Sequence, residues 1–362
     1  MILLKNGKIY KDGKFFEGDI LISEKIESID KSIDLKGLNT YDLNGEYVIP
    51  GFIDLHCHIN GAGGEGGPLT RTSPLNPEIF LKSGITTVVG LLGTDGYTRS
   101  LIDLLMHVRK LKETIDSYMF TGSYQVPSPT ITGSIAMDII LIPEIVGLKI
   151  SLSDHRSSYP SVDALKKIAS EVRVSSMLSG KRGIINVHMG DGKNKFETIY
   201  KLLEETEIPI WHFLPTHIDR NEDLLEASVE YAKKGGYLDI TANPNKTIET
   251  INFLISKGVP EENITVSTDG NGSIPQFDSI GRLIRLNISP IDSLYNIFKV
   301  LDGEMMHKFL KFVTENPANR LGFRKGKIEV GLDADFLILN ESKKIEYVVS
   351  KGRLFKLWSH IQ

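Results

Sequence analysis

The stretch Val48-Ile-Pro-Gly-Phe-Ile-Asp-Leu-His-Cys-His58 decides the fold, because a nearly continuous apolar run ends on a pair of histidines. Near-continuous apolar strands are typical of parallel sheets that are buried on both faces. Seven later runs have the same composition, and amphipathic stretches that predict helices separate several of them. These runs span Thr86–Leu92, Tyr118–Tyr124, Gly147–Asp154, Ile184–Met189, Phe213–Ile218, Leu238–Ala242 and Ile264–Thr268.

The spacing of these runs predicts the fold class. Their starts lie 25–38 residues apart, the length of a strand followed by a helix. Eight such units predict an α/β fold, a (β/α)8 TIM barrel over residues 50–322, with a doubly wound parallel sheet as the alternative. Residues 1–49 instead have the pattern of short strands joined by Asn-Gly and Asp-Gly turns, and residues 323–362 have a similar pattern. Because chain termini often lie close together, we expect both ends to form one small β-sandwich domain.

Composition excludes several classes of protein. The 362-residue chain carries 42 lysines and arginines against 46 aspartates and glutamates, so it has no basic surplus for binding nucleic acid. The single cysteine, Cys57, excludes a disulfide framework and a cysteine-based zinc site. No apolar run is long enough to cross a membrane, and the first residues lack the apolar stretch of a signal peptide. We therefore expect a cytoplasmic protein without a membrane partner.

Residue types that bind metals follow several of the apolar runs. They are His56, His58, His188, His217 and Asp269, and they end or follow the first, fifth, sixth and eighth runs. In a barrel these strand ends meet on one rim, where active sites lie. His56 and His58 are two residues apart on a strand and point the same way, whereas Cys57 points away as a small buried side chain. The His-x-His pair alone is as often two hydrogen-bonded barrel histidines, but the five residues together predict a metal site.

Lys149 lies inside the fourth apolar run, where a buried ammonium ion beside metal cations would be strongly disfavoured. One interpretation is a lysine that pairs with a carboxylate or extends outward to water. The sharper interpretation is a neutral amine that has reacted with CO₂ to give a negatively charged carbamate. Imidazole and carboxylate ligands suit Zn²⁺, and also Mn²⁺, Co²⁺ and Fe²⁺. Because these ligands outnumber the needs of one four-coordinate ion, we expect two metal ions bridged by the carbamate.

Motifs along nearly the whole chain point to one family. The His-x-His pair is followed by lysine, two histidines and aspartate in that strand order, and the tail reads Gly331-Leu-Asp-Ala-Asp-Phe-Leu-Ile-Leu339. This pattern resembles the amidohydrolase superfamily. Within it, the chain is similar to the isoaspartyl (β-aspartyl) dipeptidases. Eight segments carry that narrower resemblance: Gly61–Pro68, Val89–Asp95, Thr121–Pro127, Ile131–Ser134, Ser153–Ser157, Val187–Asp191, Leu214–His217 and Ser267–Ser273.

The resemblance implies a binuclear zinc metallopeptidase, in which a hydroxide that bridges two Zn²⁺ ions hydrolyses the β-peptide bond of isoaspartyl dipeptides. His56, His58 and Asp269 would bind the first ion, His188 and His217 the second, and carboxylated Lys149 would bridge both. Asp269 would also act as general base and then as general acid toward the leaving amine. Tyr124 would polarise the scissile carbonyl and stabilise the oxyanion, a role that suits a phenol donor.

The resemblance also implies a substrate shell whose charges complement an isoaspartyl dipeptide, which carries one ammonium group and two carboxylates. Glu65 would bind the ammonium group, and the guanidinium groups of Arg156 and Arg220 would bind the carboxylates. Taken alone, each of these three is more often a solvated loop charge, and only the surrounding motifs favour a binding role. The rest of the shell would consist of Gly63, Gly64, Thr94, Tyr124 and Ser273.

Other interpretations remain open. A different amidohydrolase, acting on cyclic amides or N-acyl amino acids, would share the metal ligands and differ in the substrate shell. A scaffold that has lost catalysis would keep only the barrel, although all six metal positions are present. The segment Thr241-Ala-Asn-Pro-Asn-Lys246 departs from the family pattern, and the loops after the seventh and eighth runs look short. The resemblance implies a homo-oligomer, up to an octamer, with a small dipeptide as its substrate.

Five histidines match no metal position, and we expect them to be structural or at the surface. They are His107, His155, His212, His307 and His360. Among these five, His155 directly precedes Arg156, so it is the best candidate for a residue that contacts the site without binding the metal itself.

Overall fold

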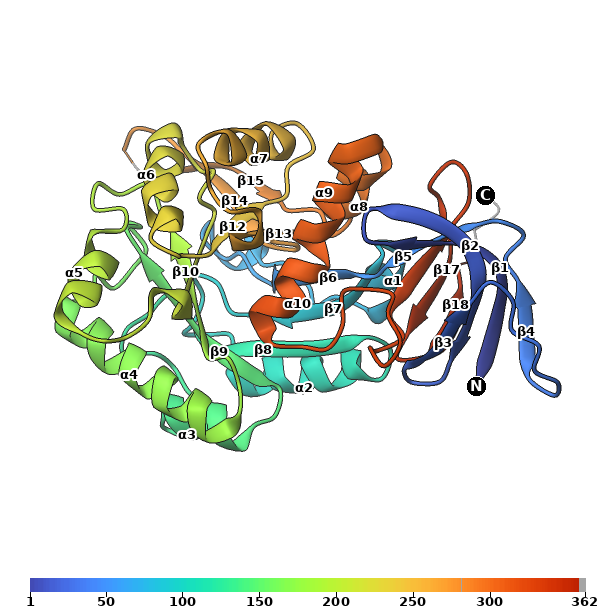
Figure 1. The fold of residues 1–362 in the computed structure, drawn as a ribbon. Coiled ribbons are helices and arrows are strands. Elements are labelled where there is room, and N and C mark those ends of the chain that lie inside the picture. Colours follow the sequence, from blue (N-terminus) through green and yellow to red (C-terminus); the bar gives the residue numbers. More distant parts are fainter. Residues whose placement is uncertain (281, 358–362) are drawn as a thin grey trace.

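The computed structural model describes residues 1–280 and 282–357, and its centre is a parallel β-barrel (Figure 1). Eight strands follow one another around it in sequence order, which confirms the TIM-barrel prediction, since a doubly wound sheet would reverse its order. The first and last strands meet where Cys57 pairs with Gly270 and the His58 N–H donates to the Gly270 carbonyl at 2.8 Å. The strands are β6 (Phe52–Cys57), β7 (Ile85–Gly90), β8 (Asp116–Gly122), β9 (Ile145–Leu152), β10 (Ile184–Met189), β11 (Phe213–Thr216), β12 (Leu238–Thr241) and β13 (Ile264–Ser267).

Helices cover the outside of the barrel (Figure 1). The N-termini of several are capped, as where the Ser161 hydroxyl accepts the Ala164 N–H at 3.2 Å. The sequence did not predict α3, α9 and α10. The helices are α1 (Pro77–Lys82), α2 (Leu101–Lys112), α3 (Ile135–Leu141), α4 (Val162–Ser179), α5 (Glu197–Glu205), α6 (Glu222–Lys233), α7 (Thr247–Ser256), α8 (Ser293–Lys299), α9 (Gly303–Val313) and α10 (Glu315–Leu321), with single turns η1 (Pro68–Thr70), η2 (Ile210–His212) and η3 (Glu261–Asn263).

Both ends of the chain build a second eight-stranded sheet, beside the barrel in Figure 1. The strand that precedes the barrel pairs with strands from both termini, which confirms the predicted small β domain. Its core is apolar and includes Leu4, Ile9, Val48, Phe336 and Ile338. The strands are β1 (Ile2–Lys11), β2 (Lys14–Ile22), β3 (Ile26–Asp30), β4 (Asn39–Asp42), β5 (Tyr47–Pro50), β16 (Phe336–Leu339), β17 (Ile345–Ser350) and β18 (Arg353–Lys356).

A two-stranded hairpin follows the last barrel strand and belongs to neither large sheet. It consists of β14 (Ser273–Phe277) and β15 (Leu283–Ile288), and helix α8 follows it. The sequence interpretation treated this segment as a shortened loop and did not predict the hairpin. Its position after β13 places it at the carboxyl end of the barrel, where active sites of this fold lie.

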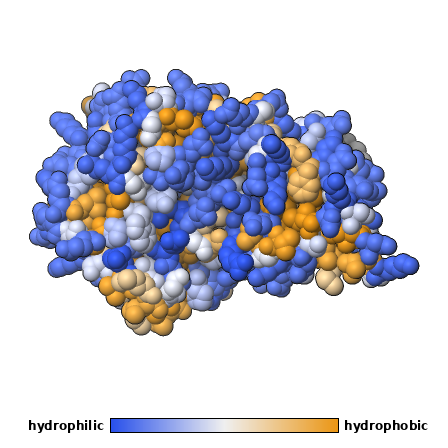
Figure 2. Space-filling view, viewed as in Figure 1, coloured by the Kyte–Doolittle hydropathy of each residue, from blue (hydrophilic) through white to orange (hydrophobic). Residues whose placement is uncertain are grey.

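The surface is largely polar, with apolar patches between the charged side chains (Figure 2). One patch lies over α3 and α4, where Met137, Leu141, Met177 and Leu178 are exposed. Exposed apolar patches of this kind often mark contacts between proteins. In the described part of the chain, none of the helices is long and apolar enough to cross a membrane.

Candidate metal and substrate site

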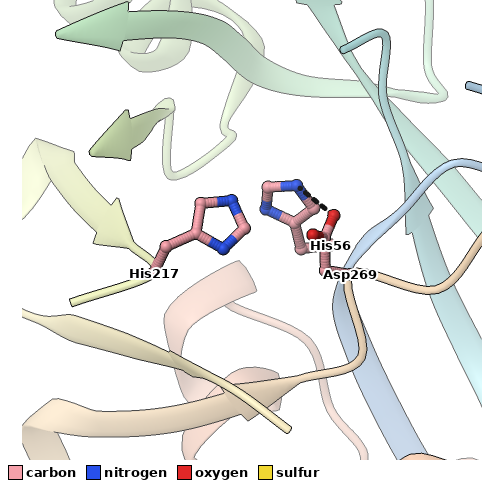
Figure 3. A group of neighbouring side chains, drawn as sticks. All are labelled: His56, His217 and Asp269. Atoms are coloured by element: carbon pink, nitrogen blue, oxygen red, sulfur yellow. Dashed lines mark ion pairs between the residues drawn. The ribbon is translucent and has the colours of Figure 1, made fainter. Parts of the chain in front are cut away.

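The six predicted metal ligands come together at the carboxyl ends of the barrel strands. His56, His217 and Asp269 point toward one another, and their ligand atoms all lie within 4.8 Å of each other (Figure 3). The Nε2 atoms of His56 and His58 lie 3.4 and 3.2 Å from Asp269 Oδ1. The ring centre of His188 lies 4.7 Å from that of His217. Strand order alone therefore brought these residues to one rim, as the sequence predicted.

The backbone at two of these positions is held in an uncommon conformation. His217 and Asp269 have φ angles of 61° and 49°, in the left-handed region that side chains other than glycine rarely adopt. Asp54 on β6 fixes the neighbouring Thr268, because it accepts the Thr268 backbone N–H at 3.0 Å and its hydroxyl at 2.5 Å. Such conformations persist where surrounding contacts enforce them, and they cluster at functional sites.

His56 and His217 of the cluster are in the neutral form that binds metals. Burial, reinforced by neighbouring positive groups, lowers the pKa of His56 and His217 well below the usual range. The contact of His56 with Asp269 is therefore not an ion pair at neutral pH. The Nδ1 atoms of His56 and His58 are buried and have no hydrogen-bond partner among the described residues. Buried polar atoms normally have partners, so this donor set fits a metal ion.

Lys149 lies among these ligands on β9 and is fully buried. Its Nζ donates to Asn186 Oδ1 at 2.8 Å and lies 3.4 Å from His56 Nε2. Burial lowers the pKa of Lys149 to about 7, with only partial opposition from Asp269 and Asp239. Within the described residues Lys149 forms no ion pair, so the interpretation of a carboxylate-paired or outward-reaching lysine is wrong. A neutral amine in such a place can react with CO₂.

Tyr124 and Asp154 hold His188 from its two sides. The Tyr124 hydroxyl donates to His188 Nδ1 at 2.6 Å, and His188 Nε2 donates to Asp154 Oδ2 at 2.9 Å. Burial raises the pKa of the Tyr124 hydroxyl, so it keeps its proton. The sequence interpretation did not single out Asp154, although it ends the fourth run and lies inside the quoted segment Ser153–Ser157.

Six of the eight predicted substrate residues line a cavity of about 420 Å³ beside the predicted metal ligands, whereas Gly64 and Glu65 are not part of its wall. Gly64 and Glu65 belong to the loop that continues from Gly63. The cavity wall contains the predicted substrate residues Gly63, Thr94, Tyr124, Arg156, Arg220 and Ser273, together with His58, His188, His217 and Asp269.

One carboxylate oxygen of Glu65 accepts hydrogen bonds, whereas the other has no partner among the described residues. Ser273 Oγ and Thr94 Oγ1 donate to Glu65 Oε1 at 2.8 and 3.3 Å, and Arg156 Nη1 lies 3.5 Å from the same atom. Glu65 Oε2 is buried and lacks a partner in the described structure. A buried carboxylate oxygen without a donor is costly, so the site is arranged to receive a cation or a hydrogen-bond donor there.

The two predicted arginines are placed differently. Arg156 forms a two-pronged contact with Asp154, with both hydrogen bonds at 2.9 Å, and its Nη1 faces Glu65 and Thr94. The carboxylate raises the pKa of Arg156 although burial opposes this, so the guanidinium stays charged. Arg220 is more exposed and is fixed by one hydrogen bond, from its Nε to the Met189 carbonyl at 3.0 Å. Both face the cavity, and binding of carboxylates by either stays a prediction.

Arg99 holds the loop that carries Glu65, a role that no sequence motif indicated. Its Nη1 donates to the Asn60 carbonyl at 2.7 Å, and its Nη2 donates to the carbonyls of Ala62 and Thr72 at 2.7 and 3.0 Å. Hydrogen bonds to main-chain carbonyls depend on the backbone path rather than on a residue motif. The loop that carries Gly63, Gly64 and Glu65 is thus held in place by Arg99, which directly precedes the N-cap of α2.

Four of the remaining histidines belong to the described residues, and of these only His155 lies beside the predicted metal ligands. His155 lines the cavity, and its ring meets the Phe277 ring edge to face at 5.6 Å. His107 and His212 contact main-chain carbonyls, at 2.7 Å each, and His307 stacks on Tyr10. His360 lies outside the described residues.

Comparison with known proteins identifies the family. The sequence model described as "Amidohydrolase family" matches residues 47–355. The chain belongs to this family. The amidohydrolase is 40% identical to the β-aspartyl dipeptidase of Fervidobacterium islandicum AW-1 in its crystal structure with a β-Asp-Leu dipeptide, over 100% of both chains with a TM-score of 0.93. A second crystal structure of that enzyme gives 38% identity and a TM-score of 0.89.

More distant relatives share parts of the chain or the fold alone. The dihydroorotase of Staphylococcus aureus strain MRSA252 is 34% identical over 118 residues, which cover 32% of this amidohydrolase and 26% of that enzyme. The chain thus spans about a quarter of the length of the curated relatives it matches. The N-acetylglucosamine-6-phosphate deacetylase of Pasteurella multocida has the same fold at 17% identity, with a TM-score of 0.64.

Proposed function

We propose that this amidohydrolase is a metal-dependent β-aspartyl dipeptidase. The observation that carries the proposal is the state of Glu65, whose Oε2 is buried and unpaired in the described structure while three donors hold Oε1. A substrate ammonium group supplies the missing donor. The full-length similarity to an enzyme crystallised with β-Asp-Leu supports the same substrate class.

Two Zn²⁺ ions are the cofactor we propose, with Co²⁺ or Mn²⁺ as substitutes. His56, His58 and Asp269 would hold one ion, and His217 and His188 the other, with Lys149 between them as a carbamate. To bind the ion, His188 would exchange one of its hydrogen bonds, to Tyr124 or to Asp154, for the metal. The neutral Lys149 amine would attack CO₂, form an N–C bond and release a proton. When bound, such ions lower the pKa of a water molecule and polarise a carbonyl group.

The reaction then uses two further properties of the chain. Asp269 lies at the cavity and would take a proton from the attacking water and pass it to the leaving amine. The Tyr124 hydroxyl keeps its proton in its buried position and would donate to the oxygen that becomes negative in the transition state. Arg156 and Arg220 would hold the two carboxylates, with Gly63, Gly64, Thr94 and Ser273 completing the shell.

Comparison of β-Asp-Leu with α-Asp-Leu tests the proposal. The purified protein, loaded with Zn²⁺ in the presence of bicarbonate, should hydrolyse the β-linked peptide and leave the α-linked one nearly untouched. Equal turnover of the two, or no turnover of β-Asp-Leu, would contradict it. The local similarity to dihydroorotase favours hydrolysis of a cyclic amide as the second candidate. Faster opening of a cyclic amide than of β-Asp-Leu would support that candidate.

We also propose a cytoplasmic homo-oligomer, up to an octamer. The exposed apolar side chains of α3 and α4 support an assembly, because monomeric proteins rarely leave such patches uncovered. Light scattering of the purified protein measures the number of subunits, and a monomer at micromolar concentration would contradict the prediction.

A further inference from the structure

The cavity has one apolar wall, and the hairpin forms most of it. Most of its lining is polar or charged, as at Asp191 and Lys246. Apart from Ala62, its aliphatic and phenylalanine residues are Ile274, Pro275 and Phe277, all on β14. None of the catalytic roles proposed above uses these three residues.

The inner face of β14 is defined by strand alternation. Ser273, Pro275 and Phe277 are half-buried, whereas Ile274 and Gln276 between them are exposed. Side chains two residues apart on a strand point to the same face, so the first three form one row. That row begins at Ser273, which holds Glu65, and ends at Phe277, whose ring meets His155 edge to face.

The hairpin packs on the loop that carries Glu65. Leu283 on β15 pairs with Phe277, and a Cβ atom added at Gly66 would lie 2.4 Å from Leu283 Cδ2. Gly66 follows Glu65 directly. The position of the apolar row is therefore fixed relative to the carboxylate that we propose binds the ammonium group.

The length of the row matches a dipeptide with its second side chain. At about 3.3 Å per residue, Pro275 lies about 7 Å beyond Ser273 and Phe277 about 13 Å beyond it. Two extended residues span roughly 7 Å. A dipeptide whose ammonium group lies at Glu65 and whose chain runs along β14 would have its second residue near Pro275, and a side chain from that residue would reach Phe277.

We propose that the inner face of β14, formed by Pro275 and Phe277 with His155 behind the ring, binds the side chain of the C-terminal residue and selects large apolar ones. This inference rests on the proposed dipeptidase function. Apolar side chains gain by leaving water for this wall, whereas charged side chains would lose hydration there without an opposite charge on β14.

Hydrolysis of a series of β-linked dipeptides tests the inference. The Zn²⁺-loaded protein is assayed with β-Asp-Leu, β-Asp-Phe, β-Asp-Gly and β-Asp-Lys. We expect kcat/KM for the Leu and Phe peptides to exceed that for the Gly peptide by roughly 10- to 100-fold, the range of discrimination by apolar pockets. The Phe277→Ala variant should reduce the ratio of kcat/KM for β-Asp-Leu to that for β-Asp-Gly by about tenfold.

Two variants of the same strand serve as controls. Gln276→Ala alters the outer face of β14 and should leave the Leu-to-Gly ratio of kcat/KM unchanged. Phe277→Leu keeps an apolar side chain on the inner face, so this variant should retain most of the Leu-to-Gly ratio. Circular dichroism checks that all variants fold. Similar kcat/KM for the Leu and Gly peptides, or an unchanged ratio in Phe277→Ala, overturns the inference while leaving the dipeptidase proposal intact. Absence of hydrolysis of every β-linked peptide by the unmodified protein overturns both.

Discussion

Two buried lysines, Lys149 in the barrel and Lys325 in the segment before β16, lie in opposite electrostatic settings. Lys149 on β9 contacts the neutral groups of Asn186 and His56, and burial lowers its pKa to about 7. Lys325 precedes β16 and contacts three carboxylates, including Asp335 at 2.6 Å. Burial alone would lower the pKa of Lys325, but Asp335 and Asp116 outweigh it and raise the pKa.

The difference separates a structural cation from a reactive amine. Lys325 also donates to Thr87 Oγ1 at 3.0 Å, so its ammonium group links the tail of the chain to β7 and β8 of the barrel. A buried charge with this many opposite charges stays protonated. Lys149 has no such compensation, and burial lowers its pKa to about 7, which favours the free amine, the form that reacts with CO₂.

The Lys149→Ala variant gives the largest expected effect. It removes the amine that the proposed carbamate needs, so metal content should fall and kcat/KM for β-Asp-Leu should drop roughly 10³-fold or more, since metal catalysis supplies several kcal/mol. Addition of a short-chain carboxylate such as propionate should restore part of the rate. Elemental analysis and steady-state assays measure these changes. A variant with full metal content and full rate would disprove the carbamate.

The Lys325→Met variant should show the opposite pattern. Removal of the cation leaves the carboxylates of Asp116 and Asp335 buried without compensation, and we expect a loss of about 3–5 kcal/mol in the free energy of unfolding. Catalysis per folded molecule should change little, because Lys325 does not line the cavity. Urea unfolding and active-site titration measure the two quantities. A stability equal to that of the parent protein would contradict this assignment.

The contrast also shows what the sequence could predict. The barrel followed from the spacing of the apolar runs. The grouping of the candidate metal ligands followed from which residues end those runs, because strand ends in this fold share one rim. Lys149 was a candidate because a lysine inside an apolar strand requires an explanation. Lys325 has no such pattern around it, since its partners Asp116, Asp333 and Asp335 come from two distant segments of the chain.

Other parts of the site could not be predicted for a related reason. The clamp by Arg99 depends on main-chain carbonyls, which any sequence supplies. The apolar row of β14 contains only Pro275 and Phe277, so its alternation is too short to predict a strand that faces the site. Asp154 was visible as the last residue of a run, but its double contact with Arg156 and His188 depends on how two neighbouring strands end. Features that arise from tertiary contacts alone leave little trace in local pattern.

The pH dependence of stability provides the smallest expected effect and tests the pKa contrast directly. In metal-free, CO₂-free protein, Lys149 is neutral above pH 7 when folded but protonated up to about pH 10.4 when unfolded. The unfolded chain then binds more protons, so Lys149 makes the free energy of unfolding rise with pH in this window. Relative to Lys149→Met, the parent protein should gain about 1.4 kcal/mol between pH 7.5 and 8.5.

The same experiment on Lys325→Met gives the matched comparison. A raised folded pKa means that Lys325 is protonated in both states up to about pH 10.4, so its contribution should stay constant between pH 7.5 and 8.5 and decline only at higher pH. Urea unfolding of the three proteins at the two pH values measures both differences. If the difference for Lys149→Met is flat or falls with pH, Lys149 is a charged lysine like Lys325, and a free amine at the metal site is excluded.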